Sequence, residues 1–350
     1  YAVGKWHVTN QLSPSGAKDN WPLQRGFDHF YGTIMGGGSY YDPATLCRGN
    51  DYITPENDPA YRPETFYYTD AIADNALQFL ATHHDRQAGK PFFMYMAFTA
   101  AHWPMQVPEE EAASYHGVFD KGWDELRREK YHRMRQSGLL DPSWALSTDE
   151  TVVPWRTVQN KDFEIRCMEV YAGIVSRMDR NIGRVVEWLR RQGMLDNTII
   201  LFMSDNGGLS SEPGWRDGEI HTQNYPLNSG KGSAYEGGVR EPMIVRWPGV
   251  VKPGSKCDKY LIIEDFYPTI LEMAGIKGYK TVQPIDGVSF MPLLKGTGDP
   301  SVGRSLFWNC PNIWGNDGPG IGPTCSVRNG DWKLIYYYET GKKELFNIPE

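Results

Sequence analysis

Apolar side chains recur with helical spacing along several stretches of the chain, and the longest stretch covers residues 163–192. Its apolar face consists of Met168, Tyr171, Ala172, Val175, Met178, Ile182, Val185, Val186 and Leu189. Gly193 follows, and glycine is the residue that most often ends a helix. Residues 68–83 show the same spacing, and helices are also expected over 123–136 and 264–274.

Continuous apolar runs of strand length occupy residues 92–98, 198–203 and 242–247. The run at 198–203 follows the long helix after one short turn, so helix and strand form an α/β unit. Because polar residues do not alternate with apolar ones in this run, we expect a parallel strand buried on both faces. The hydrophobic pattern therefore indicates an α/β core.

The pattern changes after Gly275 to short segments with strand character. These segments lie near Ser305, Cys325, Trp332 and Glu344. Asn329-Gly330 is a hairpin signal between two of them, and Thr340-Gly341-Lys342 joins the next two. We therefore expect an α/β core over residues 1–275 and a small antiparallel-sheet subdomain over residues 276–350.

Charge and composition narrow the possible functions. The 350 residues carry a formal net charge of −7, which argues against general nucleic-acid binding because that role needs a basic surface. A few local cations could still form a pocket for a small anionic substrate. No apolar run approaches the length of a membrane span. Aromatic residues make up 13% of the chain, a share that fits a wide cleft or a sugar-binding surface.

The cysteines and the chain ends give weaker signals. The five cysteines are widely spaced without a CxxC pair, which argues against zinc, and Cys310 with Cys325 is a candidate disulfide. The sequence begins at Tyr1 rather than at a methionine. We interpret it as a fragment shortened at both ends, so its lack of a signal peptide carries no information on compartment.

Two oxygen-bearing side chains follow the predicted strand 198–203. Asp205 and Asn206 stand in the segment Ser204-Asp205-Asn206-Gly207-Gly208, at the strand end where open α/β sheets hold their active sites. Their oxygens are ligands that suit Ca²⁺ or Mg²⁺ better than zinc. The same residues could equally form an ordinary Asn-Gly turn.

Two lysines and two histidines lie in further short motifs. Lys5 and His7 stand two residues apart, so in an extended segment both would face the same way and could hold an anion and move a proton. His102 follows the predicted strand 92–98, at the same sheet edge. Lys231 stands in a glycine-spaced loop, 230–240, whose spacing is not that of a P-loop but which could close on an anionic group. Each residue also has a structural alternative: a surface lysine, a packed histidine or a solvated hairpin.

Together these motifs supply hard-metal ligands, two histidines and two lysines, mostly at predicted strand ends. Hydrolysis of a small anionic ester requires this combination.

The motifs also follow one another in a characteristic order. They are GKWH (4–7), GFDHFYG (26–32), PFFMYMAFTAAHWP (91–104), SRMDRNIGRVVEWL (176–189), DNTIILFMSDNGG (196–208), GKGSAYEGGVREPMIVRWPG (230–249), DGVSFMPLLKG (286–296) and RNGDWKLIYYY (328–338). In this order they resemble the type I sulfatases of the arylsulfatase group, within the alkaline phosphatase-like superfamily. The resemblance is thin only at 40–65, 105–160 and 209–229. It implies an α/β sandwich with a central, mostly parallel sheet flanked by helices, plus a C-terminal antiparallel sheet, and sulfuric ester hydrolase activity.

The resemblance also implies roles for the candidate residues. Asp205 and Asn206 resemble two calcium ligands of the family, so Ca²⁺ is expected ahead of Mg²⁺. Lys5 and Lys231 resemble its two sulfate-contacting lysines.

The histidines have implied roles of their own. His102 resembles the histidine near the leaving-group oxygen, a candidate general acid, and His7 resembles the histidine beside the nucleophile, which helps to release sulfate. The family often has a serine after the GFDHFYG segment. Gly36 lies nearer that position and Ser39 is displaced from it, so neither is assigned.

One departure concerns the nucleophile. The family uses a formylglycine made from Cys or Ser in a C/S-x-P/A-x-R motif, upstream of GKWH together with two further Asp metal ligands, and no cysteine of this chain fits the motif. The resemblance implies that the intact protein is a sulfatase, that this piece alone is inactive, and that a formylglycine-generating or sulfatase-maturing enzyme is a partner. Periplasmic or secreted localisation is expected on the same ground.

The substrate and two other functions stay open at this point. Aromatic residues and wide loops favour a sulfated sugar over a small aryl ester, with Trp103, Trp215 and Trp314 as candidates for stacking. The alternatives are a phosphonate or phosphate monoester hydrolase of the same superfamily, which often needs two metals, and a non-catalytic relative that binds sulfated glycans.

Overall fold

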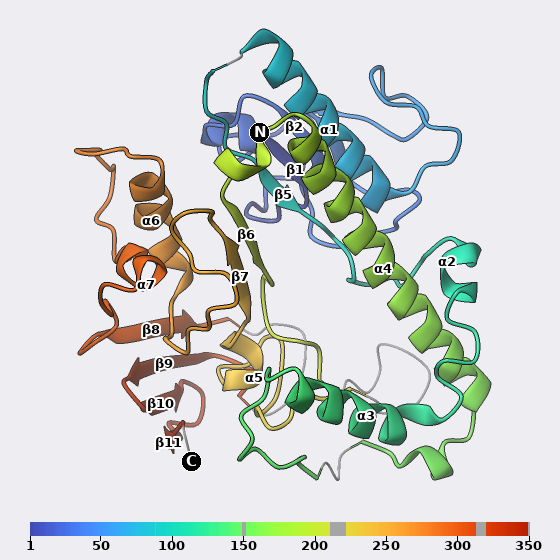
Figure 1. Ribbon diagram of the computed structural model, residues 1–350, viewed down its shortest axis with the longest axis vertical. Coiled ribbons are helices and arrows are strands. Elements are labelled where there is room, and N and C mark those ends of the chain that lie inside the picture. Colours follow the sequence, from blue (N-terminus) through green and yellow to red (C-terminus); the bar gives the residue numbers. More distant parts are fainter. Residues whose placement is uncertain (88, 149–151, 211–221, 313–319, 349–350) are drawn as a thin grey trace. The chain divides into compact units, whose positions relative to one another are not determined.

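The computed structural model describes residues 1–87, 89–148, 152–210, 222–312 and 320–348 (Figure 1). The chain divides into two compact units. Unit 1 consists of Tyr1–Trp144 and Pro154–Leu195, and unit 2 consists of Ala145–Val153 and Asp196–Glu350. Apart from the segment Ala145–Val153, the two units divide at 195/196, and within unit 2 side chains of the C-terminal sheet bind residues 235 and 236. The boundary at 275/276 stays a prediction.

Unit 1 is built on a five-stranded sheet with the order β4-β3-β2-β1-β5. Its strands are β1 (Ala2–Gly4), β2 (Phe30–Thr33), β3 (Leu46–Arg48), β4 (Asp51–Tyr52) and β5 (Tyr95–Ala97). The central strand β1 pairs in parallel with β2 and β5, with Val3 opposite Tyr31 and Met96, while β3 and β4 are antiparallel additions. The predicted strand over 92–98 is therefore present but shorter.

Helices cover this sheet (Figure 1). The α-helices of unit 1 are α1 (Tyr68–Arg86), α2 (Glu109–Ala113), α3 (Gly122–Gln136) and α4 (Lys161–Arg191), with 3-10 turns η1 (Pro22–Arg25) and η2 (Trp155–Thr157). Helix α1 packs on β1 and β2, and α4 packs on α1 and α2. The predicted helices over 68–83, 123–136 and 163–192 are confirmed, and the sheet with its helices confirms the α/β class.

The apolar face predicted for α4 is buried only in part. Val185 and Leu189 are buried, but Tyr171 and Val175 are 51% and 37% exposed. The helix instead buries Glu169 and Asn181. Buried polar groups are stable when they are hydrogen-bonded, and these have partners far away in the sequence, which periodicity does not reveal.

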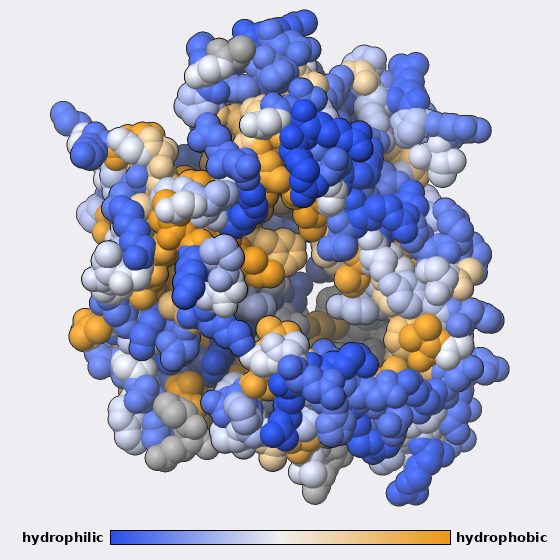
Figure 2. Space-filling model, in the orientation of Figure 1, coloured by the Kyte–Doolittle hydropathy of each residue, from blue (hydrophilic) through white to orange (hydrophobic). Residues whose placement is uncertain are grey.

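The longer segment of unit 2 begins within the 3-10 turn η3 (Leu195–Asn197). The strand β6 (Ile200–Met203) follows and pairs with β7 (Met243–Arg246). The pairing is antiparallel, with Leu201 opposite Val245, so the predicted parallel strand is wrong. The prediction of burial is wrong too, because Phe202 is 44% exposed and Met203 is 38% exposed. A short apolar run is compatible with either strand direction. Figure 2 shows hydrophobic residues at the surface among the polar ones.

The C-terminal sheet has the order β11-β10-β9-β8 and is antiparallel throughout, as predicted. Its strands are β8 (Ser305–Cys310), β9 (Thr324–Asn329), β10 (Trp332–Tyr337) and β11 (Lys343–Asn347). The helical elements of unit 2 after β6 are α5 (Glu236–Val239), η4 (Ile263–Asp265), α6 (Phe266–Met273) and α7 (Met291–Lys295).

The candidate disulfide is not formed. Cys310 and Cys325 are both free. Cys310 pairs with Thr324 and Cys325 pairs with Asn309, so the two cysteine side chains point to opposite faces of the sheet. Within the described part of the chain, no helix combines the length and the apolar character that a membrane crossing needs.

Candidate active site

Lys5 and His7 directly follow the central strand of unit 1. Backbone hydrogen bonds continue past the end of β1: the Lys5 N–H donates to the carbonyl of Ala97 and the His7 N–H donates to that of Ile34, at 2.9 and 3.0 Å. The segment is not extended as expected, because His7 has a φ of 52° in the left-handed region. The alternation that would place Lys5 and His7 on one face is therefore interrupted. Both residues nevertheless lie at the carboxyl edge of the parallel strands.

Two consecutive glycines after β2 bring His7 and His102 to the same loop. A Cβ added to Gly36 would lie 2.5 Å from the His7 ring, and a Cβ added to Gly37 would lie 3.0 Å from the His102 ring. Both rings therefore pack directly on the main chain of adjacent residues. The structure thus places Lys5, His7 and His102 at one edge of the sheet of unit 1.

Hydrogen bonds fix the orientation of His102. Its Nδ1 donates to the carbonyl of Trp103 at 2.9 Å, and the hydroxyl of Tyr40 donates to the His102 carbonyl at 3.0 Å. Since a carbonyl only accepts, Nδ1 carries a proton and Nε2 is the nitrogen that can gain or lose one. This arrangement suits a group that delivers a proton from Nε2.

In unit 2, Asp205, Asn206 and Lys231 are brought together by two loops. The Gly207 N–H donates to the carbonyl of Gly238 at 3.1 Å, and the Lys231 N–H donates to the carbonyl of Gly208 at 3.0 Å. A Cβ added to Gly207 would lie 2.0 Å from the Gly237 oxygen, so only glycine permits this approach. The segment after β6 and the loop of Lys231 therefore form one packed unit.

The donor set around Asp205 suits a hard cation. Asp205 is exposed, and the Asn206 Nδ2 donates to the Gly207 carbonyl at 3.0 Å, which leaves Oδ1 as the coordinating atom of this amide. The charge of Asp205 also acts on Glu241. Burial raises the pKa of Glu241, a hydrogen bond from Ser204 lowers it in part, and the charge of Asp205 raises it further. Carboxylate and amide oxygens are the ligands that Ca²⁺ prefers. Across the described ranges, however, no three His, Cys, Asp or Glu side chains converge on a metal position.

Comparisons with known proteins give the family. The sulfatase family model matches residues 1–276, and the model of the N-sulphoglucosamine sulphohydrolase C-terminal region matches residues 230–350. The chain belongs to the sulfatase family. It is 32% identical to an uncharacterised sulfatase of Schizosaccharomyces pombe, over 99% of this chain and 68% of that protein. It is 26% identical to an arylsulfatase of Klebsiella aerogenes, over 82% of this chain and 68% of that protein.

The solved structures agree with this assignment. A crystal structure of Ps i-CgsB in complex with k-i-k-neocarrahexaose is 25% identical, with a TM-score of 0.68, over 99% of this chain and 64% of that one. This sulfatase chain therefore spans about two thirds of the length of these proteins. The expected fold and the assignment to the sulfuric ester hydrolases are confirmed at the level of the family.

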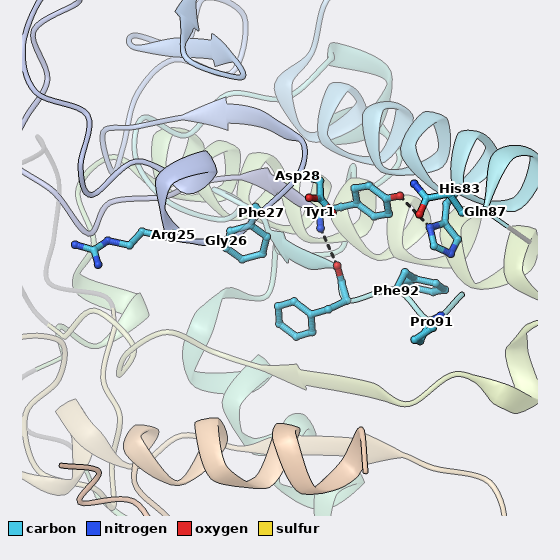
Figure 3. A pocket seen from close by; sticks show the side chains of 10 residues that line it. Tyr1, Arg25, Gly26, Phe27, Asp28, His83, Gln87, Pro91 and Phe92 are labelled. Carbon is cyan, nitrogen blue, oxygen red and sulfur yellow. Dashed lines mark hydrogen bonds between the residues drawn. The ribbon is translucent and has the colours of Figure 1, made fainter. Parts of the chain in front are cut away.

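One hollow of unit 1 lies away from the site residues of this sulfatase. Its lining includes Tyr1, Phe27, Asp28, His83 and Phe92 (Figure 3). The Tyr1 amino group donates a hydrogen bond to the Phe93 carbonyl at 2.8 Å, and the Tyr1 hydroxyl is hydrogen-bonded to His83 Nδ1 at 2.9 Å. Phe27, Asp28, Phe92 and Phe93 precede β2 and β5, so the hollow lies at the amino edge of the parallel strands. Ligands of α/β sheets bind at the carboxyl edge, where Lys5, His7 and His102 are.

Sequence reasoning missed several residues that shape the two groups. Gly37 and Tyr40 position His102, and the Asn224 amide donates to the carbonyls of Gly208 and Ser229 at 2.7 and 3.0 Å. The consecutive glycines at 36–38 were the one visible signal.

The sequence analysis also named Ser39 and three tryptophans as candidates. Ser39 serves a turn, because its Oγ accepts from the N–H groups of Tyr41 and Asp42. Trp103 is half-buried beside His102, and Trp215 and Trp314 lie outside the described residues.

Proposed function

We propose that the intact protein hydrolyses sulfate esters of a carbohydrate, with a formylglycine nucleophile located upstream of this chain. The observation that carries the proposal is the packing of His7 and His102 against Gly36 and Gly37 at the carboxyl edge of the sheet. This packing fixes two proton-transfer groups where an α/β enzyme binds its substrate.

Lys5 and Lys231 act on the sulfate group. Their ammonium groups contact sulfate oxygens and offset the negative charge that develops as the S–O bond of the ester breaks. Neither lysine exchanges a proton in this scheme.

The histidines move protons. His102 holds its Nδ1 proton on the Trp103 carbonyl, so the protonated Nε2 donates to the departing alcohol oxygen of the sugar. His7 accepts a proton when sulfate is released from the nucleophile. In this scheme His102 begins its step protonated and His7 begins its step neutral.

Asp205 and Asn206 would hold Ca²⁺ through their side-chain oxygens. When bound, this ion supplies positive charge to the sulfate group. Calcium is preferred over magnesium because a carboxylate next to an amide oxygen in a glycine-rich loop gives adaptable, oxygen-only ligation.

The choice of a sugar substrate rests on two observations. The related Ps i-CgsB structure holds a neocarrahexaose, and 13% of this chain is aromatic, which provides surfaces for sugar stacking. The related arylsulfatase of Klebsiella aerogenes makes an aryl ester the competing substrate.

The test uses the full-length protein, produced together with a formylglycine-generating enzyme, and measures sulfate release by ion chromatography. The substrates are a sulfated oligosaccharide and 4-nitrophenyl sulfate. A sugar alcohol is a poor leaving group that needs protonation, whereas 4-nitrophenolate leaves readily. His102→Gln should therefore lower kcat/KM about 100-fold or more on the oligosaccharide and much less on the aryl ester.

His132→Gln is the matched control, because His132 is an exposed histidine on α3. Equal effects of the two substitutions, or an equal loss on both substrates, would contradict the role of His102. Release of 4-nitrophenol without any release from sulfated sugars would contradict the substrate class.

Maturation and export belong to the same proposal. A formylglycine-generating or sulfatase-maturing enzyme is the expected partner, and a periplasmic or secreted location is the expected compartment. Mass spectrometry of the upstream Cys or Ser peptide in the expressed protein tests the first of these directly.

A further inference from the structure

The loop that carries Lys231 is bound to the C-terminal sheet through an acidic residue. Five positions after Lys231, the Glu236 carboxylate accepts a hydrogen bond from Lys333 Nζ at 2.9 Å and pairs with Arg328 at 3.3 Å. Lys333 lies on β10 and Arg328 lies on β9. Both contacts are inside unit 2.

Lys333 is almost completely buried, with 1% of its surface exposed, which is unusual for a lysine. Its ammonium lies 5.1 Å from the centre of the Trp308 ring, and Glu236 is its ion-pair partner. A buried ammonium without a partner is strongly unfavourable. The position of Glu236 is therefore tied to that of the sheet.

Glu236 is in turn tied to Lys231 through the main chain. The next residues, Gly237 and Gly238, pack so closely on the loop that added Cβ atoms would lie 2.2 Å from the Ser229 oxygen and 2.6 Å from the Gly230 oxygen. The Gly237 N–H also donates to the Asn228 carbonyl at 2.9 Å. A shift of Glu236 would therefore displace the backbone on which Lys231 stands.

A second connection runs beside the first. The Tyr235 hydroxyl donates to the Glu344 carboxylate, which also accepts from the Tyr337 hydroxyl at 2.6 Å and pairs with Lys342 at 2.7 Å. The adjacent residues Tyr235 and Glu236 thus bind two different charged side chains of the C-terminal sheet, Glu344 and Lys333. Two such contacts restrict rotation as well as translation of the loop.

We infer that Lys333 is a positioning residue for Lys231, and that the C-terminal sheet, through the Lys333–Glu236 ion pair, sets where the Lys231 ammonium lies. The effect on catalysis rests on the proposed function, whereas the effect on the loop does not.

The test is Lys333→Met in the full-length matured enzyme, with two readouts. Methionine fills the buried space and leaves Glu236 with Arg328. Hydrogen–deuterium exchange of the peptide covering 228–240 should become about tenfold faster or more, and kcat/KM for a sulfate ester should fall about tenfold or more. Glu236→Gln removes the counter-charge of the buried Lys333 ammonium and should change both readouts in the same direction by at least as much.

Arg304→Met is the matched control. Arg304 pairs with the fully buried Asp265 at 2.7 Å in the same unit but does not belong to the Lys231 loop. It should lower thermal stability without accelerating exchange in 228–240 and without changing kcat/KM per folded molecule.

The inference is overturned if Lys333→Met leaves exchange in 228–240 at the wild-type rate, or if exchange accelerates while kcat/KM is unchanged. If the wild-type enzyme releases no sulfate, the proposed function fails, and the exchange rate alone decides whether Lys333 holds the loop.

Discussion

At the scale of single residues, two imidazole rings of the candidate site pack directly against glycine backbone. The His7 ring occupies the space in which a side chain at position 36 would begin. His7 also has a φ of 52°, a conformation that costs free energy for a residue with a side chain. Its position is therefore maintained by the surrounding loop rather than by its own preference.

This packing predicts a sharp difference between neighbouring glycines. Gly36→Ala should displace the His7 ring and lower kcat/KM of the intact enzyme about 10- to 100-fold. Gly38→Ala is the control, because an added Cβ there meets only Ala44 N at 3.7 Å, an ordinary contact. Steady-state kinetics on a sulfate ester measure both, and equal values for the two variants would exclude a role for the ring position.

At the scale of elements, periodicity located the long helices well because α1, α3 and α4 span many turns. Strands of three or four residues, such as β2, contain too few positions to show a period, and the sequence predicted none there. The pairing of β6 with β7 joins residues that are 40 to 46 positions apart, so the direction of β6 was not visible in the local sequence either.

The candidate site likewise has features that the sequence predicted and contacts that it did not. The motifs placed His102 and Asp205 after predicted strands, Lys5 in an extended segment and Lys231 in a glycine-spaced loop, because such positions follow from local order along the chain. The contacts of Gly36, Asn224 and Lys333 join distant segments, and no local pattern marks them.

Helix α4 is joined to α1 and α2 by a partly buried ionic network. Arg177 binds Asp70 on α1 and Glu111 on α2, at 2.9 and 2.7 Å, and Arg180 binds Glu111 as well. Burial alone would raise the pKa of Glu111, but hydrogen bonds from Arg180 and Arg177 outweigh it and lower the pKa below the ordinary value of 4.5.

This network predicts a pH-dependent stability term. A carboxyl group whose pKa is lowered by folding stabilises the folded state at pH values above its ordinary pKa. That stabilisation disappears as the pH falls through the pKa of the folded state. Glu111→Gln should lower the free energy of unfolding by about 2 kcal/mol near neutral pH, with the difference from wild type shrinking below about pH 4.

Urea unfolding at several pH values measures this term. Glu110→Gln is the control, because Glu110 is 73% exposed and lies 3.9 Å from Arg177. It should change stability by less than about 0.5 kcal/mol. A difference for Glu111→Gln that does not change with pH would contradict the ionic assignment.

At the scale of the whole molecule, the proposed chemistry needs components that this chain supplies only in part. In the proposal Asp205 and Asn206 would provide two oxygen ligands, and the described residues contain no group of three or more His, Cys, Asp or Glu side chains that could hold a metal ion. The chain spans 68% of its relatives from Schizosaccharomyces pombe and Klebsiella aerogenes. Experiments on activity therefore belong to the full-length protein.

Removal of calcium should inactivate that protein reversibly. Treatment with a calcium chelator should lower kcat/KM about tenfold or more, because the sulfate charge is no longer offset. Added Ca²⁺ should restore activity better than Mg²⁺. Full activity in the chelator, with metal analysis confirming removal, would contradict the role of Asp205 and Asn206.

The central claim is that the intact protein cleaves sulfate esters. The most direct measurement compares release of inorganic sulfate and of inorganic phosphate from matched sulfated and phosphorylated sugars by the matured full-length enzyme. We predict sulfate release that greatly exceeds phosphate release and that is lost in Lys231→Met. Faster phosphate release, or no release of either anion from an enzyme with verified formylglycine, would contradict the claim.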